Sequence, residues 1–308
     1  MGNTSPVDVG ITTEVSPERT ARSGPRALLA ATRPRQWIKN ALVLAVPAAA
    51  GKLADADVAA DTALALLAFC LASAGTYLLN DVADREADRL HPIKRRRPVA
   101  AGELSVGAAT AAAVAALVLA CAVALLAEPA LVLVVAAYVG LTTAYSRGLK
   151  HVAIFDIAAV AAGFFLRAVA GGVAADLYIS KWFLILSGGG SLFLVTAKRY
   201  AEKRGVPDGG SRRVLAEYSE DYLRAMLATI AGVVVVAYCI WAFDERGGAS
   251  ATWPTAASAV PFVLGIMRYG LLVDQGHGEE PESLLFGDRT LLGLAAACVG
   301  LLALGSAL

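Results

Sequence analysis

Apolar runs close to the length of a membrane span follow one another along most of the chain, and short polar segments separate them. A spanning helix needs about 20 predominantly apolar residues. Nine runs approach or reach that length, at 37–50, 58–79, 106–127, 130–144, 152–173, 182–197, 222–243, 254–272 and 291–308. Because the first and fourth runs are short, a count of eight also fits. The pattern predicts an all-α, polytopic membrane bundle of about nine transmembrane helices.

The composition agrees with a membrane protein, because 57% of the residues are hydrophobic and only 17% are charged. A water-soluble domain carries more charge. Residues 1–25 are polar and contain no early apolar core, so we expect no cleavable signal there. We predict a disordered cytoplasmic tail at 1–26 and one transmembrane catalytic domain at 27–308. The net charge of +1 indicates no particular partner, and we expect no nucleic-acid partner.

Basic residues gather on one side of the predicted spans. Of the 27 Lys and Arg residues, all but four lie in or beside the polar segments on the amino-terminal side. The exceptions are Lys52, Lys181 and Arg246 on the other side and Arg167 within a span. The positive-inside rule therefore places the amino terminus in the cytoplasm, in an inner (plasma) membrane. The rule does not explain why acids share these segments, and the mixture indicates a site for an anion and a metal together.

An amide and three carboxylates lie at the inner end of the second run. On one continuous helix, with Asn80 at zero, Asp84 falls near about 40°, Asp88 near 80° and Asp81 near 100°. The four side chains would then share one face, and hard oxygen ligands with room for substrate phosphates suit Mg²⁺. The alternative is a solvated, charged helix end stabilised by neighbouring arginines. A solvated end does not require its acids to occupy one sector, so we expect a magnesium site.

Two basic segments flank these acids in sequence. Lys39 and Asn40 follow Trp37 at the start of the first span, where Lys39 either snorkels to the interface or reaches a phosphate. After the acids, a proline-bounded loop at 91–102 carries Lys94, Arg95, Arg96 and Arg97. Such a loop can close over a polyphosphate, and binding to anionic lipid heads is the alternative for Arg96.

A second polar cluster lies at the same membrane face. Tyr145 and Lys150 precede the fifth span, and Asp156 lies one turn inside that span, where an acid is costly and therefore a candidate functional residue. Arg167 lies deeper and within about 20° of the same helix face. The sequence does not decide whether it touches substrate or braces helices.

The longest polar insertion between spans begins at residue 198 and is the candidate lid. It contains Lys198, Arg199, Tyr200 and Glu202. The four cysteines stand alone in apolar runs and the three histidines are far apart, so neither type suggests a metal site.

These segments together resemble the UbiA-type superfamily of intramembrane prenyltransferases. Its N-x-x-x-D-x-x-x-D motif is matched by Asn80, Asp84 and Asp88. Within it, the chain is similar to the actinobacterial branch that makes phosphoribosyl-decaprenol phosphate for arabinan synthesis in the cell wall. The motifs behind that likeness are R-P-x-Q-W-x-K-N at 33–40, H-P-x-K-R-x-R-P at 91–98, Y-S-x-x-L-K at 145–150 with Asp156, and K-R-Y-A-E at 198–202.

The resemblance implies transfer of a 5-phosphoribosyl group from 5-phosphoribosyl 1-diphosphate to decaprenyl phosphate, with release of pyrophosphate. It implies Mg²⁺ on Asn80, Asp81, Asp84 and Asp88, and a catalytic set of Asp81, Asp84, Asp88, Lys150 and Asp156. The implied substrate-binding residues are Lys39, Asn40, Lys94, Arg95, Arg97, Tyr145, Lys198, Arg199, Tyr200 and Glu202. The partners would be the soluble donor, the lipid and the bilayer, and a homo-oligomer is compatible with all of them.

Two other functions stay open. Aromatic prenyltransferases of the superfamily usually carry a second aspartate pair in the later motif, whereas this chain offers Lys150 and a single Asp156. That difference favours the phosphoribosyl donor. A small-solute transporter would also use charged residues within spans. Against it, the charges concentrate on one face of the membrane, and the outer loops are nearly featureless.

Overall fold

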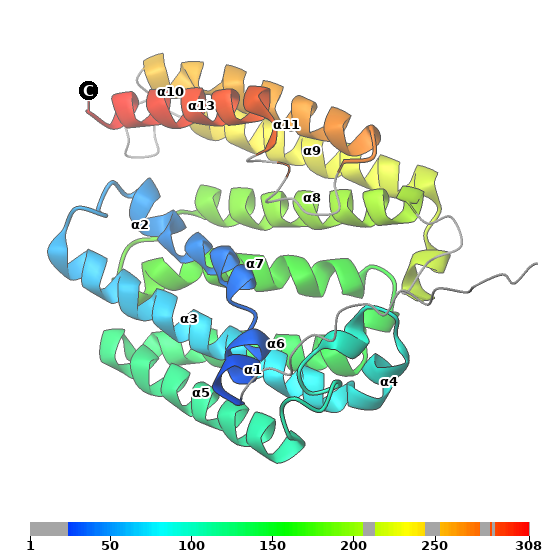
Figure 1. The fold of residues 1–308 in the computed structure, drawn as a ribbon. Coiled ribbons are helices and arrows are strands. Elements are labelled where there is room, and N and C mark those ends of the chain that lie inside the picture. The colour runs from blue at the N-terminus through cyan, green and yellow to red at the C-terminus, as the bar shows by residue number, and fades with distance from the viewer. Residues whose placement is uncertain (1–23, 206–212, 244–252, 278–283, 285–286, 308) are drawn as a thin grey trace, which may run out of the picture.

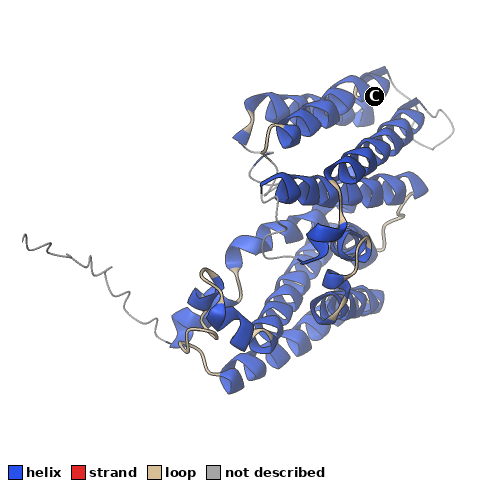
Figure 2. Ribbon diagram, turned by 90° about the vertical axis from the view of Figure 1, so that its right-hand side faces the viewer, coloured by secondary structure: helices blue, strands red, loops and turns tan. Residues whose placement is uncertain are grey.

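The computed structural model describes the chain apart from residues 1–23, 206–212, 244–252, 278–283, 285–286 and 308. Figure 2 shows only helices and loops in the described part, as the apolar runs predict. The predicted tail lies almost wholly outside the described residues, and the first helix begins at Gly24. The elements are α1 Gly24–Ala31, η1 Pro34–Leu44, α2 Ala45–Ala49, α3 Ala56–Ala83, α4 Arg85–Leu90, η2 Lys94–Arg96, α5 Val106–Ala127, α6 Pro129–Arg147, η3 Leu149–His151, α7 Phe155–Ala174, α8 Lys181–Gly205, η4 Arg213–Glu217, α9 Glu220–Phe243, α10 Trp253–Ala257, α11 Ala259–Asp274 and α13 Arg289–Ala307.

Six described segments are long and apolar enough to cross a membrane, so the predicted count of nine is not confirmed. They are α3, α5, α6, α7, α9 and the α10–α11 pair. The first predicted span is instead a 3₁₀ segment followed by a five-residue helix. α8 is 25 residues long, but its apolar stretch contains Ser-Gly-Gly-Gly-Ser at 187–191 and its last turns are charged. In α13 the apolar part is a shorter helix, Arg289–Gly305.

Capping residues stand at the amino-terminal ends of several of these helices. The Asp55 side chain accepts a hydrogen bond from the backbone N–H of Asp57 at the start of α3. Ser105 caps α5 through the N–H of Ala108, and Glu128 with Pro129 begins α6. These caps satisfy backbone donors that the first turn of a helix leaves free.

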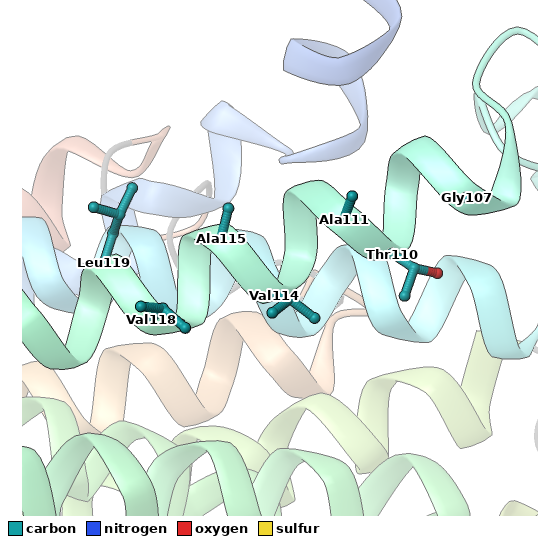
Figure 3. Close-up of a pocket in the computed structure, with 7 residues that line it drawn as sticks. All are labelled: Gly107, Thr110, Ala111, Val114, Ala115, Val118 and Leu119. Atoms are coloured by element: carbon teal, nitrogen blue, oxygen red, sulfur yellow. The ribbon is translucent and has the colours of Figure 1, made fainter.

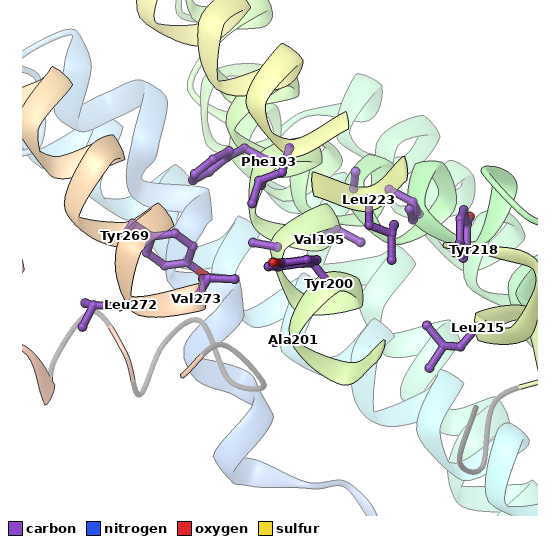
Figure 4. Packing of buried hydrophobic residues seen from close by; sticks show 14 of the residues in the cluster. Phe193, Val195, Tyr200, Ala201, Leu215, Tyr218, Leu223, Tyr269, Leu272 and Val273 are labelled. Carbon is purple, nitrogen blue, oxygen red and sulfur yellow. The ribbon is translucent and has the colours of Figure 1, made fainter. Parts of the chain in front are cut away.

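The helices form a layered bundle in which sequence neighbours mostly lie side by side (Figure 1). α3 packs on α5 and α6, α7 packs between α6 and α8, and α8 packs on α9. The largest buried cluster joins α7, α8, α9 and α11, and Figure 4 shows Tyr200, Tyr218 and Tyr269 within it. The acid-bearing α4 and the beginning of α9 lie at the same end of the bundle (Figure 1), which we call the acidic end.

The 3₁₀ segment η1 lies directly against α7, because the α7 residue at the contact is a glycine, which has no side chain. A Cβ atom added at Gly171 would lie 1.9 Å from the carbonyl oxygen of Val43. At the neighbouring Gly172, it would lie 2.6 Å from Val46 Cγ1. Glycine is therefore required at residue 171 for this approach.

A buried hydrogen-bond network around Arg167 also holds η1 in place. Arg167 on α7 donates from Nε to Asn40 Oδ1 at 2.8 Å and from Nη2 to the Tyr138 hydroxyl at 2.7 Å. Its Nη1 donates to the Gly163 carbonyl at 2.7 Å, and the Ser73 hydroxyl lies 3.3 Å from Asn40 Oδ1. Arg167 thus links η1, α6 and α7 through neutral acceptors, and Ser73 adds α3 through Asn40, which indicates a bracing role.

A shallow apolar groove runs along one face of α5 (Figure 3). Val114, Val118 and Leu119 line it, and each side chain is more than half exposed. The groove contains no titratable group, so it offers no chemistry. On a spanning helix such a face meets lipid.

Candidate active site

The acids of the first motif do not lie on one continuous helix. α3 ends at Ala83, and Asp84 takes a non-helical conformation between α3 and α4. Asp88 therefore lies on α4, and the angles expected for an unbroken helix do not describe it. The expectation that all four polar residues lie on one unbroken helix is therefore wrong. Asp81 and Asp88 still lie close together, because Nη1 of Arg97 contacts both.

Asp81 is almost fully buried and is held by two arginines from distant parts of the chain. Its Oδ1 pairs with Arg33, which precedes η1, and lies 3.3 Å from Nη1 of Arg97 in the loop after η2. Its other oxygen, Oδ2, is buried without a hydrogen-bond partner. A buried, unpartnered carboxylate oxygen is costly unless a cation or donor joins it.

The other two acids are also neutralised. Arg97 Nη1 lies 2.6 Å from Asp88 Oδ2, so the same guanidinium bridges Asp81 and Asp88. Asp84 is one-third exposed and lies 3.8 Å from Lys150 Nζ on η3. Lys150, which the sequence places with Tyr145 and Asp156, thus contacts an acid of the first motif instead. Three carboxylates face three cations here, and we call these residues with Asn80 the acidic cluster.

The donor set of the acidic cluster suits a divalent ion, although its acids do not converge on one point. Among the residues that the structure describes, no three His, Cys, Asp or Glu side chains lie close enough together to hold a metal. Arg97 forms ion pairs with Oδ2 of Asp88 and with Oδ1 of Asp81. The unpartnered Oδ2 of Asp81, the partly exposed Asp84 and the half-buried Asn80 offer hard oxygen ligands. By the chemistry of these oxygens, the residues fit a divalent ion.

Arg33 is a site residue that the sequence reasoning missed. Its backbone is left-handed, with φ 55° and ψ 61°, a conformation that non-glycine residues rarely adopt. Its guanidinium lies 4.7 Å from the centre of the Tyr77 ring and pairs with Asp81. The two contacts stabilise this conformation and bring the start of η1 to the acids. Its place as the first residue of the motif at 33–40 could have suggested it.

A second cluster surrounds Asp156 at the beginning of α7. Asp156 is fully buried, and Arg199 Nε on α8 lies 2.7 Å from its Oδ2. The Tyr218 hydroxyl donates to its Oδ1 at 2.6 Å. Arg199 also contacts Glu202 Oε2 at 2.9 Å and the Tyr145 hydroxyl at 3.5 Å. The structure thus brings Arg199 and Glu202, from the start of the candidate lid, to Tyr145 and Asp156.

Tyr218 ties the chain before α9 to this cluster. Its hydroxyl also accepts a hydrogen bond from the backbone N–H of Ile154, a residue with a positive φ of 70°. Burial raises the pKa of Tyr218 above its usual value, and the hydrogen bond to Asp156 acts in the same direction. The phenol therefore remains protonated at neutral pH. The described end of the predicted lid is anchored here by a residue that was not in the predicted site.

Two predicted substrate-binding residues point elsewhere. Asn40 is fully buried in the hydrogen-bond network around Arg167. The Tyr200 hydroxyl donates to Asp274 Oδ1 at 2.8 Å, on the side of α8 that faces α11. Tyr200 follows Arg199, and consecutive helix residues point about 100° apart, so only Arg199 reaches Asp156.

The remaining predicted residues lie around the two clusters. Lys198 Nζ is 3.9 Å from Glu202 Oε1 at the Asp156 cluster. Lys39 and Lys94 are half-buried, and Arg95 is exposed. None of these positions tests a substrate contact, so their roles stay predictions.

Most of the chain is similar to known transferases. A model of the UbiA prenyltransferase family matches residues 41–305. The decaprenyl-phosphate phosphoribosyltransferase of Mycolicibacterium smegmatis is 42% identical, over 94% of this chain and 96% of that protein. The enzyme of the same name from Mycobacterium tuberculosis is 44% identical, over 87% of this chain and 90% of that protein.

The fold is similar to solved structures at low sequence identity. A UbiA homolog from Archaeoglobus fulgidus, bound to DMAPP and Mg²⁺, has a TM-score of 0.70 at 17% identity. The match covers 92% of this chain and 99% of that one. This likeness agrees with the helical bundle predicted from the apolar runs.

Proposed function

Since the chain belongs to the UbiA prenyltransferase family, we propose that it transfers the 5-phosphoribosyl group of 5-phosphoribosyl 1-diphosphate to decaprenyl phosphate and releases pyrophosphate. The observation that carries this proposal is the 42–44% identity to decaprenyl-phosphate phosphoribosyltransferases over most of the chain. The family and the apolar helices make it an integral membrane enzyme.

The Asp156 cluster supports this donor over a prenyl diphosphate. Both oxygens of Asp156 are engaged, one by Arg199 and the other by Tyr218. The other carboxylate of the cluster, Glu202, pairs with Arg199 at 2.9 Å and with Lys198 at 3.9 Å. The cluster therefore presents a guanidinium and phenols rather than a second metal site. Such donors suit a ribose and a phosphate.

The reaction requires no general base. A phosphate oxygen of decaprenyl phosphate forms a bond to the anomeric carbon, and the bond from that carbon to the diphosphate oxygen breaks. The electron pair leaves with pyrophosphate. The attacking phosphate is already anionic at neutral pH, so no proton needs to be removed from it. The chain's own task is to align the two substrates and to neutralise the leaving charge.

We assign the acidic cluster to the diphosphate. Asn80, Asp81, Asp84 and Asp88 would hold a divalent ion, Mg²⁺ in our proposal, which would neutralise charge on the leaving group. The basic loop adds phosphate contacts through Lys94, Arg95 and Arg97. The Asp156 cluster and Lys150 orient the ribose and the incoming lipid phosphate, through Tyr145, Lys198, Arg199 and Glu202. Asp156 acts on substrate through Arg199.

The proposed location follows from the charge distribution. Most Lys and Arg residues lie in the sequence segments predicted to be inside, which include the acids, so we propose that the acidic end faces the cytoplasm in the plasma membrane. The soluble donor then reaches the site directly, and the isoprenoid tail of the acceptor stays in hydrocarbon between the apolar helices. A homo-oligomer stays a prediction.

The test is transfer of label by the purified full-length protein. Donor labelled in the ribose is incubated with decaprenyl phosphate, with Mg²⁺ or with a chelator. We expect labelled lipid with Mg²⁺ and none with the chelator. Absence of labelled lipid, together with turnover of a prenyl diphosphate onto an aromatic acceptor, would establish the aromatic prenyltransferase instead. Solute uptake into proteoliposomes without pyrophosphate release would establish a transporter.

A further inference from the structure

The acidic cluster is electrically balanced by side chains alone. Arg33, Arg97 and Lys150 face Asp81, Asp84 and Asp88, at one formal charge each. A divalent ion entering this balanced cluster would add two positive charges, and a diphosphate alone would add negative ones. Either ligand alone therefore meets an unfavourable field, whereas the two together restore the balance.

Arg97 occupies the positions that a metal would need. Its Nη1 lies 2.6 Å from Asp88 Oδ2 and 3.3 Å from Asp81 Oδ1, so a single nitrogen bridges two carboxylates. The oxygen of Asp81 turned away from it is the buried one without a partner. A cation that gathered Asp81, Asp84 and Asp88 would have to displace Arg97 from Asp88.

Arg97 combines a partly exposed side chain with an anchored backbone. Its side chain is one-quarter exposed, and the residue directly follows the end of η2. The following residues Pro98, Val99 and Ala100 are buried, so the backbone is anchored and only the side chain needs to turn. Arg33, by contrast, is stacked on Tyr77 and fixed beside η1.

We propose that Arg97 is an exchangeable counter-ion: it holds Asp81 and Asp88 in the metal-free protein and moves to the diphosphate of the donor when a divalent ion takes its place. This inference rests on the proposed function for the identity of the donor but applies to any diphosphate. Metal and diphosphate then bind cooperatively, because the metal frees the guanidinium that the diphosphate needs. Linkage requires each ligand to raise the affinity for the other by the same factor.

The experiment measures binding, not turnover. Free Mn²⁺ is followed by electron paramagnetic resonance during titration of the purified full-length protein, with and without inorganic pyrophosphate. The data are corrected for the complex that Mn²⁺ and pyrophosphate form in solution. In wild type, we expect pyrophosphate to raise the Mn²⁺ affinity by about 10-fold or more, within the usual range of coupling between sites. Independent binding of the two ligands would overturn the proposal.

The variant Arg97→Gln separates the two halves of the exchange. Without pyrophosphate, we expect it to bind Mn²⁺ about 10-fold more tightly than wild type, because nothing has to be displaced. With pyrophosphate, the gain in Mn²⁺ affinity should shrink by a similar factor. A merely structural role would weaken both measurements together. Unchanged or weaker Mn²⁺ binding by folded Arg97→Gln protein would therefore contradict the proposal.

Arg96→Gln is the matched control. Arg96 is exposed in the same loop and forms no ion pair with a described residue. It should leave both affinities within about twofold of wild type, since a screened surface charge contributes little. If Arg96→Gln reproduced the effects of Arg97→Gln, general loop charge would explain them and the proposed exchange would be wrong. The labelled-donor assay decides the proposed function separately, because these titrations contain no ribose and no lipid.

Discussion

The Nε atom of Arg199 lies 2.7 Å from Oδ2 of Asp156, and both side chains are almost completely removed from solvent. The pair joins α7 to α8 across a sequence separation of 43 residues. Removal of one partner of a buried pair leaves an uncompensated charge, which costs more than removal of both.

This pair predicts non-additive effects on stability. We expect Asp156→Asn and Arg199→Gln each to lower the free energy of unfolding by about 3–5 kcal/mol. The double variant should lose less than the sum, with a coupling of about 0.5–3 kcal/mol. Thermal unfolding of the three proteins in one detergent, followed by circular dichroism, measures the difference. Strictly additive losses would show that the pair does not act as a unit.

Asp84 offers the clearest test of the metal assignment. Asp84→Asn should lower kcat/KM for pyrophosphate release by about 100-fold or more, because charge stabilisation of a leaving group contributes on that scale. Part of the loss should return at high Mg²⁺. Glu86→Gln is the control, since Glu86 is largely exposed two residues along and contacts only Arg85 and Arg89 among described residues. Equal losses in both variants would point to helix α4 rather than to the metal.

The contact between α7 and η1 predicts a strong difference between two glycines. In Gly171→Ala, the new methyl group would meet the Val43 carbonyl oxygen, so we expect a loss of about 1–3 kcal/mol or more. Gly140→Ala lies on α6 with nothing within 4 Å and should be neutral, or more stable by up to about 1 kcal/mol through helix propensity. The melting temperatures of both variants in detergent check this. Equal melting temperatures would contradict the close approach of η1.

Tyr218 predicts a dependence of stability on alkaline pH. Its pKa is raised in the folded protein, so the folded state keeps the phenol proton more tightly than the unfolded chain. The resulting stability is fully present below the ordinary tyrosine pKa of about 10 and is lost as the pH rises toward the raised value. Between about pH 9 and pH 11, a range that brackets the ordinary tyrosine pKa, the melting temperature of Tyr218→Phe should therefore fall less than that of wild type. Parallel curves would mean that the Tyr218 phenol titrates normally.

Much of the fold follows from local sequence. Runs such as 106–127 and 222–243 are apolar for long enough to require a membrane, and α5 and α9 match them closely. The structure of the first run, at 37–50, does not follow from local sequence. Its 14 residues form a 3₁₀ segment and a short helix, which pack against Gly171 of α7. The break at Asp84 was missed because no proline or glycine marks it.

The sequence by itself determined the membrane class, the family and the acids around which both polar clusters form, because span length and motif spacing are properties of neighbouring residues. The tertiary structure decided which side chains contact these residues. Arg33 and Arg97 pair with Asp81, Arg199 and Tyr218 bind Asp156, and Arg167 donates to Asn40. These contacts span up to 127 residues. Their selection depends on how helices pack, since each buried charge must find a partner among the side chains that packing brings within reach.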